Sequence, residues 1–432
     1  MKSFKVSILL LLLSVTLIEC NQSSEAQNLS FNSDNGDITL PQGFQAVVVA
    51  DSVGKARHIA VAPNGDIYVA LSHLKNGNGI VALRDVNGDG KADQKEYFGN
   101  LTGTGIDLHD GYLYFSNDTS VVRYRMREHN LVPSTTPEIV VSGFPEQNQH
   151  APKAFTFDNK GHIYVNVGAP SNSCQEKDRT KESPGIDPCP LLEKHAGIWQ
   201  FNSNKTGQTQ DADGHRYATG LRNVVGLDWN KGNNTLYVTQ HGRDQLYQNW
   251  PDYYTKEDGA ELPAEEFFEV HDGDNFGWPY SYYDQHKQNI MLAPEYGGDG
   301  NKTVNESKWA GQFKEPIMAF PGHWAPDDLI FYTGNEFPEK YQDGAFIAFH
   351  GSWNRAPLPQ QGYNVVFIPF KGDKPSGDYE VFADGFKGKE ILETPSMATY
   401  RPVGLAIGPD GSLYITDSQK GKIWRIAYTK KE

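Results

Sequence analysis

The sequence predicts an all-β fold, a six-bladed β-propeller with long loops between its strands. One pattern recurs along the chain: a short apolar strand, a turn of the Pro-Asn-Gly or Pro-Asp-Gly kind, and a second strand rich in tyrosine and β-branched residues. Such turns between alternating strands are strong hairpin signals. The composition agrees, because 43 glycines, 25 prolines and 12% aromatic residues suit a turn-rich β protein.

The repeated units set the expected number of blades. The clear copies span residues 58–71, 105–117, 155–168, 226–240 and 404–418, and a divergent copy lies around 344–353. Hairpin units at irregular spacing indicate propeller blades that carry insertions. The repeated aromatic positions are then expected between neighbouring blades. A β-sandwich or a two-domain β protein is the structural alternative.

The two ends of the propeller are expected to meet. Residues 43–50 and 422–428 both have the composition of strands, and their pairing in one blade would close the ring. Closure removes exposed sheet edges. Helix signals are few, and the pattern predicts only short helices, for example around residues 263–270.

The first residues predict an export signal over 1–26, which leaves 27–432 as a single propeller domain. Lys2 and Lys5 precede an apolar run that is too short to span a bilayer. Two routes of cleavage stay open. Cys20 ends a lipobox-like Leu-Ile-Glu-Cys and would then carry a lipid, or cleavage follows Ala26. The expected location is the periplasm or the cell surface, lipid-anchored through Cys20 or otherwise secreted.

Cysteine usage and charge bear on the compartment and the partners. Cys174 and Cys189 remain after export, and an oxidising compartment favours a disulfide between them. Two free thiols are the alternative. The net charge of −15 argues against nucleic acid and anionic membrane surfaces as partners.

Polar residues next to the repeated strands are the candidates for chemistry. A propeller gathers the loops of all blades at one mouth of its channel, so residues distant in sequence converge there. Arginines clustered at that mouth in an acidic protein call for an anionic ligand. Each residue taken alone also has a structural interpretation, as a surface, hydrogen-bonding or packing residue. The candidates are His150, Asn172, Arg222, Asn223, His241, Gly242, Arg243, Asp244, His323, Trp324, His350, Arg355 and Arg401.

These segments resemble the soluble quinoprotein sugar dehydrogenases, in particular the sorbosone and pyranose dehydrogenase branch that uses pyrroloquinoline quinone (PQQ). The resemblance covers nearly the whole mature chain. It rests on YATGLRNVVGLDWN from Tyr217, LYVTQHGRDQL from Leu236, GDNFGWPY from Gly273, PGHWAPDDLIFY from Pro321 and FHGSWNR from Phe349.

The resemblance implies a cofactor site. PQQ would lie across the channel mouth, with calcium held by the backbone at Gly242 and Arg243. Relatives with the glucose-oxidising pattern have proline where this chain has Arg243, so backbone coordination stays open and the resemblance does not fix the shape of this loop. His150 is expected to be the general base, and Arg222 to stabilise negative charge. The implied cofactor-binding residues are Asn172, Asn223, His241, Arg243, His323, Trp324, His350, Arg355 and Arg401.

The implied function is an exported dehydrogenase that depends on PQQ and calcium and oxidises aldoses or related sugars. The chain has no Cys-x-x-Cys-His motif for covalent haem, so electrons would pass to an external quinone or cytochrome. Two other functions remain open. One is a non-catalytic extracellular binding module, and the other is a calcium-dependent lactonase. The sequence does not name the sugar, the electron acceptor or the oligomeric state.

A separate motif fits a calcium-binding loop. The segment from Asp85 to Glu96 matches the twelve-residue pattern D-x-[DN]-x-[DN]-G-x5-E. Such a loop normally lies between helices, but here its neighbours are strand-like, so an acidic turn is the alternative. The expected ligands of a structural calcium ion are Asp85, Asn87, Asp89, Asp93 and Glu96.

Overall fold

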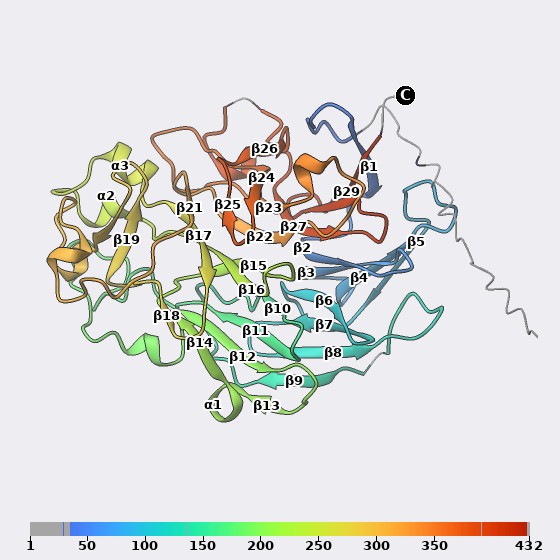
Figure 1. Cartoon of the computed structure of the whole chain (residues 1–432), viewed down its shortest axis with the longest axis horizontal. Helices are drawn as coiled ribbons and strands as arrows, with labels where there is room; N and C mark the ends of the chain where they lie inside the picture. Colours follow the sequence, from blue (N-terminus) through green and yellow to red (C-terminus); the bar gives the residue numbers. More distant parts are fainter. Residues whose placement is uncertain (1–28, 30–34, 135, 390, 430–432) are drawn as a thin grey trace, which may run out of the picture.

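The computed structural model describes residue 29 and residues 35–429, apart from residues 135 and 390. The export signal predicted over 1–26, with Cys20, lies outside the described residues. The described part of the chain forms six antiparallel blades around a central channel (Figure 1). The predicted six-bladed propeller is confirmed, and the sandwich alternative is wrong.

The blades follow one another along the chain, and the first strands of neighbouring blades pack together around the channel. The blades are β2 (Ala56–Val61), β3 (Ile67–Lys75), β4 (Asn78–Arg84), β5 (Gln94–Phe98); β6 (Ile106–His109), β7 (Tyr112–Ser116), β8 (Val121–Arg125), β9 (Glu138–Ser142); β10 (Phe155–Phe157), β11 (His162–Val167), β12 (Gly197–Asn202), β14 (His215–Thr219); β15 (Val224–Asn230), β16 (Thr235–Gln240), β17 (Glu265–Val270), β21 (Met318–Phe320); β22 (Pro326–Phe331), β23 (Gly344–Phe349), β24 (Asn364–Lys371), β26 (Glu380–Ala383); and β27 (Pro402–Ile407), β28 (Leu413–Asp417), β29 (Ile423–Tyr428), β1 (Phe44–Ala50).

The first and last strands close the ring, as predicted. Strand β1 pairs antiparallel with β29, with Phe44 opposite Tyr428, so the blue and red ends of the chain lie side by side in Figure 1. Phe44 is buried and packs edge-on against Phe337 and Phe382 of the fifth blade. Ring closure therefore also buries an aromatic cluster between the last two blades.

In three blades the repeated tyrosine of the second strand ties the blade to the next one. The hydroxyl of Tyr68 donates to the carbonyl of Leu131, that of Tyr114 to Ser203, and that of Tyr237 to Asp373. All three tyrosines are fully buried. A buried hydroxyl needs a hydrogen-bond partner, and the neighbouring blade supplies it here. The expectation that repeated aromatic residues lie between blades is confirmed.

The helix predicted around residues 263–270 is wrong. Glu265–Val270 is strand β17, which pairs with β16 on one side and β21 on the other. Two short helices precede it instead, α2 (Leu246–Asn249) and α3 (Lys256–Glu261). Thr255 begins α3 with a capping box to Asp258. Pairing with two neighbouring strands outweighs the local helix propensity of this segment.

Short elements lie in the insertions between the blade strands. Two insertions, one with α2 and α3 between β16 and β17 and one with β19 between β17 and β21, form a lobe at the left of Figure 1. The remaining elements are β13 (Gln208–Thr209), β18 (Asp274–Asn275), β19 (Ser281–Asp284), β20 (Asn289–Leu292), β25 (Lys374–Pro375), α1 (Gln210–Asp213), and the 3-10 turns Pro190–Glu193, Pro294–Tyr296, Val304–Glu306, Glu339–Tyr341 and Pro395–Met397.

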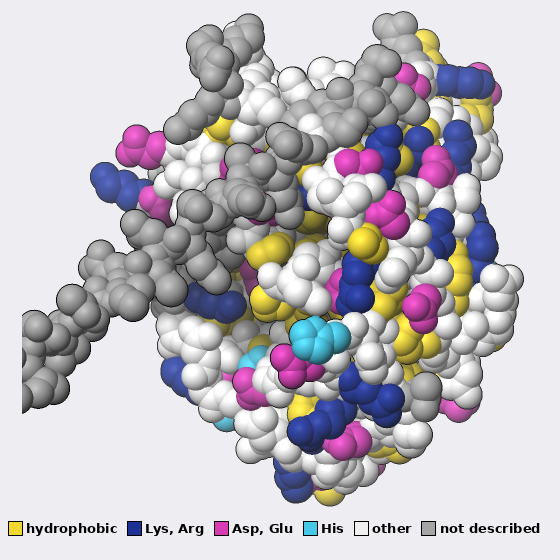
Figure 2. All heavy atoms as spheres, turned by 90° about the vertical axis from the view of Figure 1, so that its right-hand side faces the viewer, with side chains coloured by type: hydrophobic (Ala, Val, Ile, Leu, Met, Phe, Trp, Pro, Cys, Tyr) yellow, Lys and Arg dark blue, Asp and Glu magenta, His cyan; other side chains and the backbone are white. Residues whose placement is uncertain are grey.

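The surface shows no strong segregation of charge on the face that Figure 2 presents. Acidic and basic side chains are intermixed there. Within the described ranges, no helix is both long enough and apolar enough to cross a membrane.

Candidate active site

A cavity of about 220 Å³ collects polar side chains from several blades. Its residues come from loops between strands and from the start of β17, so the rigid blades hold them at fixed positions. Six of the candidate residues named from the sequence line it, and the others are new. The lining residues are Gln149, His150, Arg179, Arg222, His241, Gly242, Asp244, Glu265, His323, Ala325 and Trp353.

A second cavity of about 240 Å³ lies between the inner strands and is lined by Asp107, Asp228 and Asp328 among others. Burial raises the pKa of Asp107 to about 6 and that of Asp228 to about 7. The carboxylates of Asp228 and Asp328 accept hydrogen bonds from strand backbone amides. Only the cavity of about 220 Å³ combines arginines, histidines and carboxylates in its lining, so it is the candidate active site among these two cavities.

His150 has the geometry of a general base. Its Nδ1 lies 2.6 Å from the carbonyl oxygen of Ala169, which can only accept, so Nδ1 carries the hydrogen. In the neutral ring, Nε2 then keeps a free lone pair. Burial, followed by the nearby Arg222 guanidinium, lowers the pKa of His150 to about 3. The main-chain carbonyl of Ala169 orients the base, a role that the sequence did not assign to any residue.

The backbone at the site is held in uncommon conformations. His150, His323 and Ala325 have φ values of 52°, 68° and 58°, in the left-handed region. Residues other than glycine occupy this region at a cost, and they do so most often at functional sites. The two predicted histidines therefore lie on a backbone that the surrounding fold constrains.

Arg222 is the centre of a buried network. It is 3% exposed, and its guanidinium donates to the carbonyl oxygens of Asn172 and Gly242. It also donates to Asn172 Oδ1 and to Asp244 Oδ2, each at 3.0 Å. Burial alone would raise the pKa of Asp244, but Arg222, above all, brings that pKa below its ordinary value. Asn172 thus holds the guanidinium of Arg222 by hydrogen bonds, and it is not among the residues that line the cavity.

Arg179 is a second cation at the site, and the sequence analysis missed it. Its guanidinium donates to Gln149 Oε1, to Gln245 Oε1 and, at 3.1 Å, to Asp244 Oδ2. It projects from the long loop between β11 and β12. No local pattern marks Arg179, because only the folded loop brings it to Asp244.

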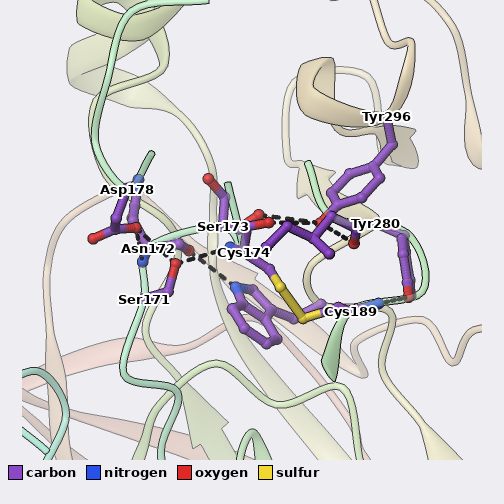
Figure 3. Close-up of a disulfide and its surroundings, with 10 residues drawn as sticks. Ser171, Asn172, Ser173, Cys174, Asp178, Cys189, Tyr280 and Tyr296 are labelled. Carbon is purple, nitrogen blue, oxygen red and sulfur yellow. Dashed lines mark hydrogen bonds between the residues drawn. A yellow bond between two sulfur atoms is a disulfide. The ribbon is translucent and has the colours of Figure 1, made fainter. Parts of the chain in front are cut away.

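The predicted disulfide between Cys174 and Cys189 is confirmed and fixes this loop (Figure 3). The amide of Cys189 donates to the hydroxyl of Tyr280 at 2.9 Å. Asp178, next to Arg179, accepts hydrogen bonds from Ser171 and from the amide of Asn172. The disulfide therefore secures the segment that supplies both Asn172 and Arg179 to the site.

Removing the disulfide is expected to destabilise the protein and to weaken the site. Closure of a loop with a sequence separation of 15 is worth about 3 kcal/mol in the chain-entropy account. We expect a Cys174→Ser/Cys189→Ser variant to lose about that much unfolding free energy in urea titrations. Dithiothreitol should lower the stability of the parent protein and leave the double variant unchanged. Equal stability of both proteins would contradict this.

Gly242 lies between two fixed groups. Its amide donates to Glu265 Oε2 at 2.9 Å, and its carbonyl accepts from Arg222. Burial raises the pKa of Glu265, whose other oxygen accepts from the amide of Ala325. Glu265 was not predicted as a site residue, because inside a strand sequence it has no distinguishing signal.

The predicted histidines at the cavity wall are also held in place. His241 Nε2 lies 2.9 Å from the carbonyl oxygen of Pro326 and 3.3 Å from Asp327 Oδ1. Burial lowers the pKa of His241, but the hydrogen bond with Asp327 turns the net shift upward. His323 Nε2 lies 3.1 Å from the carbonyl oxygen of Gly259, which leaves Nδ1 on the side of Asp244 at 4.0 Å.

Two predicted arginines do not line the cavity. Arg355 is 2% exposed and binds Glu261 and the carbonyl oxygens of Ala260, Gly322 and Pro359. Its guanidinium anchors a loop, and its expected contact with cofactor carboxylates stays a prediction. Arg401 likewise donates to the carbonyl oxygens of residues 350 and 351. Both arginines have carbonyl oxygens in reach, which sequence alone does not reveal.

Four other predicted residues do not line the cavity and make contacts elsewhere in the surrounding structure. The guanidinium of Arg243 forms a buried ion pair with Glu295. Its Nε and Nη2 have no hydrogen-bond partner among the described residues, and its expected role at the cofactor stays a prediction. Trp324 packs on Phe349, and His350 lies 2.6 Å from the hydroxyl of Ser418. Asn223 is buried, and its Oδ1 has no hydrogen-bond partner.

The predicted calcium loop forms a structured turn between β4 and β5. Asp85 accepts from the amides of Gly88 and Gly90, and Asp93 accepts from the amide of Val86. Glu96, the expected last ligand, lies in β5 opposite Ala82. Nowhere in the described ranges do three or more His, Cys, Asp or Glu side chains gather as a metal site. Asp85, Asp89 and Asp93 cap the turn, and calcium binding by this loop stays a prediction.

Comparisons with known proteins give one consistent family. The sequence model described as TrAA12-like matches residues 38–429. An uncharacterized protein of Borreliella burgdorferi is 26% identical over 407 residues, which cover 91% of each chain. A pyrroloquinoline quinone-dependent pyranose dehydrogenase of Coprinopsis cinerea is 25% identical over 231 residues, which cover 48% of this chain and 30% of that protein.

Solved structures show the same fold. The calcium structure of a Trichoderma reesei enzyme of carbohydrate-active family AA12 superposes with a TM-score of 0.73 at 18% identity. The superposition covers 93% of this chain and 99% of that one.

Proposed function

Because this chain belongs to the TrAA12-like family, we propose that it is a PQQ-dependent sugar dehydrogenase. The observation that carries the proposal is His150, whose Nε2 is left free beside a cavity that also holds Arg179 and Arg222. The family's homologues include PQQ-dependent sugar dehydrogenases. The proposed reaction is oxidation of an aldose or a related sugar at a hydroxyl-bearing carbon.

The residues at the cavity fit an anionic cofactor. Arg179, Arg222 and His241 supply cationic or hydrogen-bonding groups to carboxylates on a planar ligand. Asn223 Oδ1 is a buried oxygen without a protein partner, as expected where a bound group or water completes the hydrogen bonds. In this arrangement Arg222 and Arg179 replace Arg355 and Arg401 as the arginines nearest the ligand.

A calcium ion in this cavity would need backbone and cofactor oxygens as ligands. The described residues gather no group of three acidic or metal-binding side chains, so a bound ion depends on other oxygens. Backbone carbonyls at Gly242 and Arg243, together with oxygens of the cofactor, would meet the preference of calcium for oxygen. Glu265 adds a carboxylate beside Gly242.

The chain's own residues would perform the proton chemistry. His150 accepts at Nε2 the hydroxyl proton that the sugar loses as its carbon is oxidised. Ala169 holds the ring through Nδ1, so the basic nitrogen stays on the cavity side. Arg222, fixed by Asn172 and Asp244, presents positive charge where negative charge develops. When bound, PQQ supplies the two-electron acceptor, and calcium polarises its quinone oxygen.

The shifted pKa of His150 predicts the pH dependence. A general base acts in its neutral form, so activity is lost as the pH falls through its pKa. Burial and Arg222 lower that pKa from 6.5 to about 3, which moves the acid limb to lower pH. We expect kcat/KM to stay constant down to below pH 6.5. An acid limb above that value, measured by steady-state kinetics across pH, would contradict the assignment.

We further propose that the protein is exported. The support is the apolar N-terminal run with its two possible cleavage sites and the disulfide between Cys174 and Cys189. Electrons would leave to an external quinone or cytochrome.

Reconstitution tests the proposed function. Purified mature protein is stripped with chelator, and PQQ is added with and without calcium while dye reduction is followed across aldoses and ketoaldoses. We expect turnover that requires both additions. If PQQ neither binds nor supports oxidation of any sugar, the proposal fails. Hydrolysis of an aldonolactone without PQQ would favour the lactonase, and sugar binding without turnover would favour the binding module.

A further inference from the structure

Trp353 is the exposed aromatic residue at the rim of the cavity. The chain has eight tryptophans, all within the described ranges, and Trp353 is 55% exposed while the others are buried or half-buried. It also lines the cavity with His150 and Arg222. A ligand that covered this indole would remove apolar surface from water, which is favourable.

The loop that carries Trp353 is pinned on its N-terminal side. Ser352 is fully buried, and its amide donates to the carbonyl of Gln361 while its hydroxyl accepts from the amide of Gln361. The hydroxyl of Tyr363 donates to the carbonyl oxygen of Ser352 at 2.7 Å. Gly351 has a φ of 94°, and a Cβ there would lie 2.2 Å from the Tyr363 ring. This packing fixes the backbone directly before Trp353.

Arg355 anchors the loop on the C-terminal side of Trp353. That guanidinium is buried and bound to Glu261 and to the carbonyl oxygens of Gly322 and Ala260. Trp353 thus lies between two anchored residues, and its exposure follows from a held conformation. A rigid exposed indole can bind a ligand with little loss of conformational entropy.

The position fits one face of a sugar. A pyranose ring has an apolar face of C–H groups and polar hydroxyls at its edge. An indole offers a flat apolar surface with a partial negative charge that attracts such C–H groups. Polar groups lie in the adjacent cavity, among them His150 and Gln149. If a planar cofactor occupies this cavity of about 220 Å³, the rim beside Trp353 is where a sugar would meet it.

We propose that Trp353 is the stacking platform for the pyranose ring of the substrate. This inference rests on the proposed function and adds to it a residue that selects cyclic sugars. Trp353 acts on binding and takes no part in proton transfer. Its loss therefore weakens the binding of pyranoses and spares both the chemical step and the affinity for PQQ.

The kinetic test compares Trp353→Ala and Trp353→Phe on a pyranose and on glyceraldehyde, which is acyclic. For Trp353→Ala we expect the pyranose KM to rise about fivefold to tenfold, the size of a stacking contact. The kcat, the PQQ dissociation constant and the KM for glyceraldehyde should stay within twofold. Trp353→Phe should restore most of the affinity. Tyr253→Ala, which removes an exposed aromatic that does not line the cavity, is the matched control.

Three results would contradict the proposed role of Trp353. An unchanged pyranose KM overturns the proposal. A weaker PQQ affinity with an unchanged pyranose KM assigns Trp353 to the cofactor and also overturns it. Equal increases in KM for both substrates indicate a structural role and overturn it as well.

A binding measurement separates this inference from the proposed function. Saturation-transfer NMR with methyl β-glucoside detects sugar binding by the PQQ-free protein without any turnover. Signal in the wild type that is lost in Trp353→Ala and kept in Trp353→Phe supports the platform, even if PQQ supports no oxidation. If reconstitution succeeds and the variants bind the glucoside like the wild type, the platform fails and the dehydrogenase stands.

Discussion

Replacement of His150 by alanine is expected to lower kcat about 10²- to 10⁴-fold, the usual contribution of a general base. The physical reason is that Nε2 is the free ring nitrogen, since Nδ1 is bound to the carbonyl of Ala169. Binding of PQQ should change little, because the arginines at the cavity remain. The measurement is steady-state dye reduction with reconstituted protein, together with a PQQ titration of each variant.

Controls distinguish loss of the base from loss of structure. His129→Ala removes a histidine whose side chain is 89% exposed, and it should leave kcat unchanged. Added imidazole should restore part of the activity of His150→Ala, because the small ring can occupy the vacated space. A His150→Ala protein that keeps more than about a tenth of the wild-type rate would exclude a general base at this position.

Replacement of Arg222 by glutamine should have the largest effect on stability. The change leaves Asp244 with Arg179 as its remaining ion-pair partner and removes donors from two buried carbonyl oxygens. Breaking a buried pair from one side costs about 3–5 kcal/mol. We expect a loss at the lower end of that range in urea unfolding, because Arg179 still pairs with Asp244. Cofactor affinity should fall as well.

A double-mutant cycle tests the cause. Asp244→Asn in the Arg222→Gln background removes the carboxylate left without its main partner, so part of the stability should return. Arg127→Gln, a change of an exposed arginine, is the matched control and should shift the free energy of unfolding by less than about 0.5 kcal/mol. Additive effects of the two site substitutions would show that Arg222 and Asp244 are not coupled.

Much of the fold could be predicted because its determinants are local. Each Asn-Gly or Asp-Gly turn joins two strands that are adjacent in sequence, so a short window contains the hairpin signal. Closure by residues 43–50 and 422–428 also follows, since an open ring would leave two exposed edges. The helix expected over 263–270 failed because β17 is decided by its partners β16 and β21, which lie outside that window.

The site was predictable where residues flank a repeated strand. His150, Arg222, His241 and His323 were found in this way, and the structure brings all four to one cavity. Arg179 lies in an insertion and Glu265 inside a strand, where the sequence gives no local signal. Gln149 and Trp353 lie beside residues that the sequence did single out, but their own side chains carry no distinguishing pattern. Arg355 and Arg401 carried the expected chemistry at the expected blade positions, but both donate to main-chain carbonyls, and Arg355 also to Glu261, which only the fold brings into reach.

By itself, the sequence determined the repeated hairpins, the closed ring, the pairing of Cys174 with Cys189, and the positions of His150 and Arg222. Only the tertiary structure decided which nitrogen of His150 is free, which arginines are bound to other groups, and that Arg179 and Trp353 reach the cavity. The physical reason is the separation in sequence between the residues that interact. Turns and strand alternation depend on neighbours in sequence, whereas burial, ion pairing and exposure depend on loops that converge from different blades.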